Sequence, residues 1–430
     1  MDVLKNYIRL QNDRHYQCLD LPVKEASLFV VIPCFNEPDL LPTLDSLAAC
    51  HPPKSAVSVL VVVNDSEDAS QEAVGLNSST LEVIAQWQQQ HPDLFFELRR
   101  MYAHALPCKW AGVGWARKMG MDEAVRQLAV NGYRDGIIVS FDADSTVLPN
   151  YLQAIESAFN ENPQFNFFTI HFEHPFENNG LENHLREGII RYELHMRYYR
   201  NALQWCGYPH AIHTVGSSFA LKASAYAKQG GMNRRKAGED FYFLHKLVLL
   251  GPYGNIASTT VFPSPRQSDR VPFGTGAALK KWAEGGTGLN VTYCFEAFGI
   301  LKPFLSGSAR WWTIPPTEIE TFTGNFHPLL QTFLVQTETI RQLLELRSNC
   351  SGSPVFERRF FHLINAFWLL KFINFAHENL FTRSDLQYEA VKLLQHIDIQ
   401  LQCDDSLENI LKIYRNLDQS VDPSHFSEQL

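Results

Sequence analysis

The stretch Gly136-Ile137-Ile138-Val139-Ser140-Phe141-Asp142-Ala143-Asp144-Ser145 joins a hydrophobic run to a pair of carboxylates. Its β-branched and aromatic residues, bounded by Gly136 and Pro149, predict a buried strand. Asp142 and Asp144 follow this strand directly, and ligands bind at the carboxyl ends of strands in open α/β sheets. Two such oxygen ligands suit Mg²⁺ or Mn²⁺, which neutralises a bound diphosphate. Because a chain with twenty aspartates contains one D-x-D by chance, the surrounding pattern decides what the pair means.

Hydrophobic runs and helical patterns alternate on the amino-terminal side of this strand. The runs are nearly continuous, as is typical of parallel strands buried on both faces. One of the helical patterns shows an interruption near Gly75. The alternation predicts an α/β fold with a doubly wound, mixed but mostly parallel sheet flanked by helices. The predicted strands cover residues 27–33, 57–63, 94–100 and 137–141, and the predicted helices cover residues 38–49, 69–90 and 114–128.

The second half of the chain changes character twice. Prolines and glycines accumulate from Pro263 to Gly288, which is typical of a functional lid. Beyond about Asn325 the pattern is almost wholly helical, over 329–346, 355–380 and 384–401, and predicts an appended C-terminal helical domain. The predicted division is an N-terminal extension (1–27), a sheet domain (28–270), a lid and acceptor-loop region (271–324) and the helical domain (325–430).

Composition limits the classes of function. A net charge of −9 and a pI near 6.0 argue against nucleic-acid binding. Eight scattered cysteines without a C-x-x-C pair indicate reduced thiols, and residues 1–20 contain no signal peptide, so we predict a cytoplasmic protein. The longest apolar stretch, Phe360 to Phe375, is shorter than the roughly 20 residues of a spanning helix. Core packing is its favoured interpretation; peripheral contact with the inner membrane surface and burial in a homodimer are the alternatives.

Four further motifs surround the opening stretch. Pro33-Cys34-Phe35-Asn36-Glu37 follows the first predicted strand, and Asn64-Asp65-Ser66 follows the second. Trp115-Ala116-Arg117-Lys118-Met119-Gly120 opens a helix, and so does Gly238-Glu239-Asp240, which is preceded by Gly230-Gly231-Met232. Because polar loops after neighbouring buried strands lie at the same sheet edge, these motifs predict one crevice.

The order and spacing of these motifs over residues 28–270 resemble the inverting glycosyltransferases of family 2, which have the GT-A fold. VVIPCFNE (30–37) is similar to the opening strand of that family, VVNDSEDAS (62–70) to its nucleoside-binding loop and GVGWARKMG (112–120) to its arginine-bearing helix start. SFDADS (140–145) is similar to its D-x-D, and GGM…GED (230–240) to its acceptor strand and catalytic acidic pair. The resemblance implies a nucleotide diphosphate sugar as donor and Mg²⁺ or Mn²⁺, held by Asp142 and Asp144, as cofactor. Its implied donor contacts are Pro33, Phe35, Glu37, Asp65, Arg117, Asp142 and Asp144, and its implied acceptor or diphosphate contacts are Gly216, Ser217, Arg266 and Arg270.

The donor-binding candidates each have a structural alternative. Asp65 can accept hydrogen bonds from the N–H groups of uracil or guanine, or it can cap a helix or form an Asx turn. Asn64 stands where the family commonly has a first aspartate, which leaves one carboxylate in this loop. Arg117, near a helix N-terminus, matches phosphate oxygens, or it forms a surface ion pair. Arg266, Arg270 and Lys280 can close over the diphosphate or grip an anionic acceptor, or they lie in a solvated loop.

The metal and catalytic candidates are the two acidic pairs. Asp142 and Asp144 point to the same side if the strand alternates normally, so one cation can bridge them to the diphosphate. His171, His174, His213 and His245 are candidates for a third ligand, and none is assigned. Asp240 is the predicted general base that takes the proton of the acceptor hydroxyl, and Glu239 orients it or the acceptor. The alternative is an acidic first turn that complements the helix dipole.

Three functions compete. The leading hypothesis is transfer of a single sugar to a small-molecule or lipid-linked acceptor, because Gly307 stands three residues before Arg310-Trp311, where processive family members have the glutamine of Q-x-x-R-W. The second is a nucleotidyltransferase, which would need a glycine-rich phosphate loop that PCFNEPD lacks. The third is an inactive nucleotide-sugar-binding scaffold, which the presence of both acidic pairs disfavours.

Overall fold

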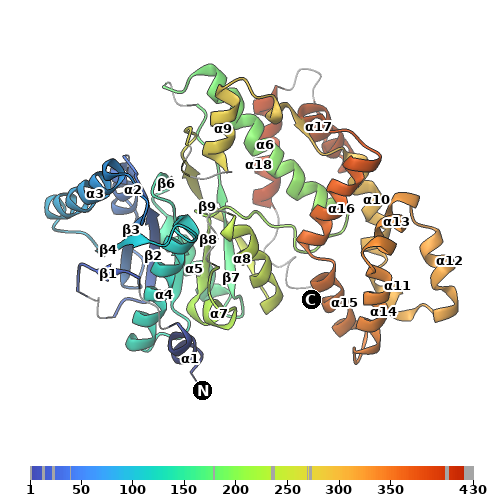
Figure 1. Cartoon of the computed structure of the whole chain (residues 1–430), viewed down its shortest axis with the longest axis horizontal. Helices are drawn as coiled ribbons and strands as arrows, with labels where there is room; N and C mark the ends of the chain where they lie inside the picture. Colours follow the sequence, from blue (N-terminus) through green and yellow to red (C-terminus); the bar gives the residue numbers. More distant parts are fainter. Residues whose placement is uncertain are drawn as a thin grey trace. The chain divides into compact units, whose positions relative to one another are not determined.

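This computed structural model describes residues 2–11, 15–21, 25–38, 40–177, 180–233, 238–268, 270, 274–401 and 406–420. The largest sheet of these residues is mixed and has nine strands (Figure 1). The strand order is β1-β4-β3-β2-β5-β8-β7-β9-β6. β4, β3, β2 and β5 are parallel, and so are β7 and β9, whereas β8, β6 and β1 pair antiparallel with their neighbours. The predicted α/β fold with a mixed, mostly parallel sheet is confirmed. The strands are β1 (Gln17–Cys18), β2 (Leu28–Cys34), β3 (Val57–Ser66), β4 (Phe96–Leu106), β5 (Ile137–Ser140), β6 (Ser145–Val147), β7 (Phe167–Phe172), β8 (Phe219–Lys222) and β9 (Gly254–Pro263).

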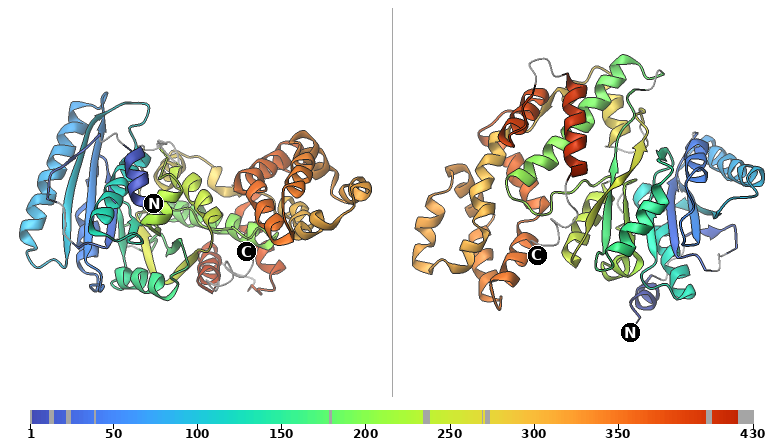
Figure 2. Two further views of the ribbon diagram at one scale, coloured as in Figure 1. Left: turned by 90° about the horizontal axis from the view of Figure 1, so that it is seen from below. Right: turned by 180° about the vertical axis from the view of Figure 1, so that it is seen from behind.

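The helices between the parallel strands cover both faces of this sheet. The chain moves outward from β2 to β3 and β4 through α2 (Leu40–Ala48) and α3 (Gln71–Gln90), and then returns to β5 through α4 (Val113–Asn131). Since crossovers between parallel strands are right-handed, the return places α4 on the face opposite to α2 and α3 (Figure 2). The direction of winding reverses between β2 and β5, and open α/β sheets bind ligands at the carboxyl ends of the strands where such a reversal occurs.

A glycine allows α4 to lie close to the sheet. A methyl group at Gly120 would overlap Val31 Cγ1 and Val62 Cγ2, which belong to β2 and β3. Only a residue without a side chain therefore permits this approach. The close contact sets the position of Arg117, which lies one turn earlier in α4 and points toward the carboxyl end of β5.

The N-terminal extension is packed onto the sheet unit. Tyr7 of α1 (Val3–Leu10) donates a hydrogen bond to Asp122 Oδ1 at 2.6 Å, and Lys118 Nζ donates to Tyr7 Oη at 2.9 Å and to Asp122 Oδ2 at 2.8 Å. Tyr226 of α7 (Ala223–Lys228) donates to Asp122 Oδ1 at 2.8 Å. This buried polar cluster joins α1, α4 and α7, so residues 3–10 belong to the same unit as the sheet.

The described chain separates into two compact units whose boundaries differ from the predicted ones. The first consists mainly of residues 1–179 and 214–280, and the second mainly of residues 180–213 and 281–417. The difference arises because α6 (Asn183–Trp205), an insertion between β7 and β8, packs against helices of the second unit. The second unit also begins before the predicted residue 325, because residues 281–324 fold with it.

The second unit is helical, as predicted, apart from a short pairing of β10 (Val291–Thr292) with β11 (Ser384–Asp385). The stretch from Phe360 to Phe375 is not one helix, because α15 ends at Leu363 and α16 begins at Ala366. Phe360 and Phe372 are both fully buried in the core, as the favoured interpretation required. Among the described residues, no helix combines the length and the apolar character needed to cross a membrane. After α6 the helices are α10 (Phe295–Ser306), α11 (Ser308–Thr313), α12 (Ile319–Gly324), α13 (Pro328–Gln336), α14 (Thr339–Ser348), α15 (Ser353–Leu363), α16 (Ala366–Asn379), α17 (Leu386–His396) and α18 (Leu407–Ser420).

Candidate active site

Arg117 holds two predicted site carboxylates together at the carboxyl end of the sheet. Its Nη2 donates to Asp142 Oδ1 at 2.5 Å, and its Nη1 donates to Glu239 Oε1. Asp142 follows β5, and Glu239 is the first residue of α8 (Glu239–Leu247). The guanidinium therefore joins three elements that lie far apart in the sequence.

The surroundings of Arg117 exclude a surface ion pair. Its side chain is 2% exposed, and its Nε has no hydrogen-bond partner in the described part of the chain. The backbone of Gly216 lies against the guanidinium, because a Cβ at that position would come within 2.9 Å of Nη2. A buried charge needs opposite charges around it. Arg117 thus offsets part of the negative charge of Asp142 and Glu239 and fixes the start of α8 next to β5.

Asp240 lies beside this ion pair and has an unusual acidity. α8 begins after Gly238, whose φ of 69° lies in the left-handed region that favours glycine. The Asp240 carboxylate accepts a hydrogen bond from the Phe241 N–H at 2.7 Å. Burial, together with the negative charge of Glu239, raises the pKa of Asp240 from 3.8 to about 7. A carboxylate with this pKa can take up a proton near neutral pH.

Arg266 and Arg270 form a second cluster with Glu37 and Asp144. Arg266 donates from Nη2 to Glu37 Oε2, and from Nη2 and Nε to Asp144 Oδ2 at 2.9 and 3.2 Å. Arg270 donates from Nη1 to Glu37 Oε2 at 2.7 Å and to the carbonyl of Phe35 at 3.1 Å. The structure thus gathers five predicted residues at one edge of the sheet, and both arginines are paired with carboxylates although their side chains remain partly exposed.

The segment that we predicted to be a long lid contains a helix, α9 (Thr275–Ala283). It begins soon after β9 ends at Pro263, and it shortens the irregular part of the segment. Residue 269 and residues 271–273 of the predicted lid lie outside the described residues. Arg266 and Arg270 belong to the remaining irregular part, which folds back onto the carboxyl end of β2.

Asp65 lies inside the protein rather than at a helix cap. Its carboxylate is fully buried and accepts hydrogen bonds from the Ala105 N–H at 2.8 Å and from Tyr102 Oη at 3.0 Å, and it contacts His104 Nδ1 at 2.8 Å. The cap of α3 is Ser70, which accepts from the Ala73 N–H. Asp65 therefore fixes the end of β4, where Tyr102 and His104 reach the surface.

The other predicted positions are distributed around these clusters. Pro33 is buried within β2, opposite Val62, and Ser217 is fully buried next to Ser218. Among the described residues, one group of three His, Cys, Asp or Glu side chains has its ligand atoms within 4.8 Å of one another, and it consists of Cys294, Glu296 and Glu389. None of the four candidate histidines therefore forms such a group with Asp142 and Asp144. His171 instead pairs with Glu173, and His174 with the Thr275 hydroxyl.

Sequence reasoning did not include Tyr102 and His104. The two rings are stacked, with centroids 5.5 Å apart, and the His104 side chain is half exposed. The predicted third strand ended at Arg100, whereas β4 continues to Leu106. The signal that could have found them is the alternation of Tyr102, His104 and Leu106 beyond that residue.

The arrangement combines three chemical features. Two partly exposed arginines and the partly exposed Asp142 and Asp144 carboxylates can hold a diphosphate together with a cation. The Asp240 carboxylate can accept a proton close to this anion site. Aromatic side chains at the end of β4 offer a surface to a planar base.

The chain is similar to known glycosyl transferases in its sequence pattern and in its structure. The model of glycosyl transferase family 2 matches residues 29–228, and that of glycosyl transferase family group 2 matches residues 137–368. None of the curated proteins matches the chain significantly. Among solved structures, TarS residues 1–349 from S. aureus in complex with UDP-GlcNAc is 12% identical, with a TM-score of 0.40 over 88% of this chain and 93% of that one. The mannosyltransferase PcManGT from Pyrobaculum calidifontis, in complex with GDP-Man and Mn²⁺, is 14% identical, with a TM-score of 0.34 over 96% of this chain and 91% of that one.

Proposed function

Since the chain belongs to the family 2 glycosyltransferases, we propose that it transfers a single sugar from a nucleoside diphosphate sugar to an acceptor hydroxyl, with inversion at the anomeric carbon. The observation that supports this reaction best is Asp240, whose pKa of about 7 lies close to the pH at which a general base works. Arg117, Asp142 and Glu239 surround it with fixed charges. The acceptor in this proposal is a small molecule or a lipid-linked hydroxyl compound.

Asp240 acts in this reaction as the general base. Its carboxylate takes the proton of the acceptor hydroxyl while that oxygen forms a bond to the anomeric carbon of the sugar. The bond between the anomeric carbon and the diphosphate oxygen breaks on the opposite face, and the electron pair leaves with the diphosphate. Glu239, held by Arg117, keeps the first turn of α8 in place, so that Asp240 faces the acceptor.

The donor's diphosphate is the proposed ligand of the arginine clusters. Arg266 and Arg270 bridge Glu37 and Asp144 and can turn one or more N–H groups to phosphate oxygens. Asp65 is buried, so its carboxylate does not contact the base directly in this proposal. It orients Tyr102 and His104, and these two side chains contact the base.

Asp142 and Asp144 fit a divalent cation. Both side chains reach solvent at the end of β5, with exposed fractions of 33% and 27%, and carboxylate oxygens are the ligands that Mg²⁺ and Mn²⁺ prefer. When bound there, the cation supplies positive charge to the departing diphosphate. Since the described residues supply no third carboxylate, imidazole or thiol to this pair, the remaining ligands in this proposal are donor oxygens and water.

A donor screen tests the proposal. The full chain is heated with UDP, GDP, dTDP and CDP sugars, with Mn²⁺ and then with EDTA. A ligand present at 100 times its Kd stabilises the folded state by about 2.7 kcal/mol. We therefore expect the sugars of one base to raise the melting temperature by several degrees with Mn²⁺ and by much less with EDTA.

The Asp144→Asn variant is the matched control for the metal. It keeps the shape of the side chain but removes the charge, so we expect it to lose the difference between Mn²⁺ and EDTA while its own melting temperature stays near that of the parent. If no nucleotide sugar shifts the melting temperature, the proposed function is wrong. If the shift is the same with EDTA, the metal assignment alone is wrong.

A further inference from the structure

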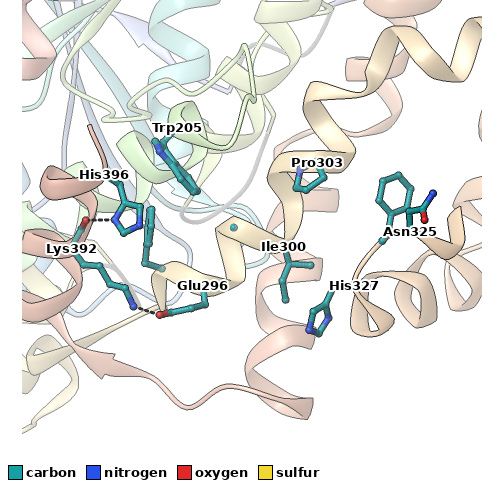
Figure 3. A pocket seen from close by; sticks show the side chains of 11 residues that line it. Trp205, Glu296, Ile300, Pro303, Asn325, His327, Lys392 and His396 are labelled. Carbon is teal, nitrogen blue, oxygen red and sulfur yellow. Dashed lines mark hydrogen bonds and ion pairs between the residues drawn. The ribbon is translucent and has the colours of Figure 1, made fainter. Parts of the chain in front are cut away.

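The helical unit contains an open cleft of about 400 Å³ over one face of α10. Gly299, Ile300 and Pro303 of this helix form its apolar floor. Figure 3 shows Trp205 and His396 on one side of the helix and Asn325 with His327 on the other. The walls thus come from the end of α6, the end of α17 and the turn between α12 and α13.

The middle of the floor is open because residue 299 is glycine. A Cβ at this position would have no described atom within 4 Å, so packing does not require glycine here. Glycine in a helix interior is also less favourable than alanine. Its effect is to leave room above the centre of α10, between the two walls.

The rim offers both hydrogen-bond donors and acceptors. His327 Nδ1 accepts from the Leu329 N–H at 3.1 Å, so Nε2 of the neutral ring carries the hydrogen and donates. His396 Nδ1 lies 2.8 Å from the Lys392 carbonyl and donates to it, so its Nε2 accepts. Glu296 and Lys392 form an ion pair beside the floor and largely cancel each other's charge. Asn325 adds an amide that both donates and accepts.

This pattern selects one chemical class of ligand. The Glu296 carboxylate already accepts from Lys392 Nζ and Cys294 Sγ, so an inorganic anion would gain no cation from this pair and would leave His396 Nε2 without a donor. A hydrocarbon chain would desolvate all the rim groups without replacing their hydrogen bonds. A sugar ring has hydroxyl groups that both donate and accept, and C–H faces that can lie on an apolar floor. We propose that the cleft binds a sugar residue of a neutral oligosaccharide.

The aromatic wall of the cleft is already ordered. The rings of Trp205 and Phe295 have centroids 4.4 Å apart, and Lys302 Nζ lies 3.8 Å from the centroid of the Trp205 ring. His396 packs against Phe295 with a centroid distance of 4.6 Å. Binding to a wall that is fixed beforehand loses less side-chain entropy, so this side of the cleft suits a weakly held ligand such as a sugar.

Two substitutions at one position test the site. Saturation-transfer NMR is recorded on the full chain with maltotriose, cellotriose, mannotriose and chitotriose, and with inorganic phosphate as the anionic probe. We expect at least one trisaccharide to bind. Gly299→Leu fills the centre of the floor and should weaken this binding at least tenfold, whereas Gly299→Ala should bind within threefold of the parent. The melting temperature of each variant shows that it is folded, and Asn325→Ala, which changes only the rim, should weaken binding several-fold.

The outcomes separate this proposal from the transferase proposal, because binding is measured without a donor. The proposed sugar site is wrong if no trisaccharide binds, or if phosphate occupies the cleft instead. It is also wrong if Gly299→Leu binds a trisaccharide as well as Gly299→Ala does. The nucleotide-sugar shift in melting temperature should be the same in all these variants. A chain that shows that shift but binds no trisaccharide overturns the sugar site alone, and the reverse result overturns only the proposed transfer.

Discussion

The proton acceptor of the proposed reaction is a single side chain, Asp240, whose surroundings oppose its negative charge. Burial and the neighbouring Glu239 carboxylate both favour the protonated form, while Arg117 favours the charged form less strongly. The resulting pKa of about 7 leaves a large fraction of the group deprotonated at neutral pH. It also makes the base stronger than an ordinary aspartate, which matters for removing a proton from a hydroxyl group.

The first prediction is a pH dependence of turnover. Because only deprotonated Asp240 can act as the base, kcat/KM should rise with pH up to about 7 and then level off. Below that value it should fall about tenfold for each pH unit. An aspartate with its usual pKa of 3.8 would give a flat profile down to about pH 5. The measurement is kcat/KM at subsaturating acceptor between pH 5 and pH 9.

The contribution of Asp240 to folding stability changes with pH in the opposite direction to kcat/KM. Its pKa is higher in the folded chain than in the unfolded chain, so the folded state binds more protons between about pH 4 and pH 7. The contribution of Asp240 to stability therefore decreases as the pH rises through this range. Loss of turnover at low pH is thus not explained by unfolding through this group.

Asp240→Asn should abolish turnover at every pH and still bind the donor. Turnover near the parental rate in this variant would show that Asp240 is not the base.

The sequence predicts a site residue when the residues that position it lie close to it in the sequence. Asp142 and Asp144 follow a strand that the sequence marks clearly, and Glu239 and Asp240 begin a helix as predicted. The bond from Arg266 to Glu37 joins positions that are 229 residues apart, so no local pattern could indicate it. One hydrogen bond to the buried Asp65 carboxylate comes from the N–H of Ala105, which has a positive φ of 52°. That conformation is rare for alanine, and propensity does not predict it.

At the scale of elements, the sequence located most helices of the sheet unit but misjudged where helices stop. α3 runs unbroken through Gly75, because one exposed glycine costs only about 1 kcal/mol in a helix with many other stabilising residues. The predicted helix over 329–346 is divided at Glu338, which has a φ of 53°. The one over 355–380 is divided at Asn365, whose side chain accepts from the Phe367 and Trp368 N–H groups. An asparagine that caps a helix was visible in the sequence, whereas the turn at Glu338 was not.

The second prediction concerns the attachment of α1 to α4. Tyr7→Phe removes the hydroxyl that bonds to both Lys118 and Asp122 in a buried cluster. Burial, followed by the charge of Asp122, raises the pKa of Tyr7 far above its usual value, so the phenol stays a neutral donor. Losing a buried hydrogen bond of this kind costs about 1–3 kcal/mol, to be measured by urea denaturation. The same change at the exposed Tyr133 should cost less than about 0.5 kcal/mol, and equal effects would mean that the cluster does not stabilise the fold.

At the scale of the whole molecule, the two units are not consecutive in the sequence. α6 leaves the sheet unit after β7 and returns before β8, so the helical unit is assembled from residues on both sides of the segment 214–280. Composition indicated the helical character of residues 325–430, but it could not indicate that α6 joins them. The reason is that the apolar positions of α6 would suit a sheet face or a helical core equally well.

The last prediction tests how the helical unit is closed. Arg415 of α18 donates from Nε and Nη2 to both oxygens of the fully buried Glu193 on α6, at 2.7 and 2.9 Å, and Arg197 donates to the same carboxylate at 2.8 Å. Arg415→Met keeps the bulk of the side chain but removes the cation that contacts both oxygens of Glu193, so we expect a loss of about 3 kcal/mol in the free energy of unfolding. Arg186→Met is the matched control, because Arg186 pairs with Glu408 between the same two helices, with both side chains about one third exposed. A pair in contact with solvent contributes less than about 1 kcal/mol. Urea denaturation gives the change in the free energy of unfolding for each variant. Hydrogen–deuterium exchange in α6 should be faster in Arg415→Met than in the parent, and unchanged in Arg186→Met. This result would show that the buried pair, and not helix contact in general, holds α18 to α6. Equal effects of the two substitutions would contradict this.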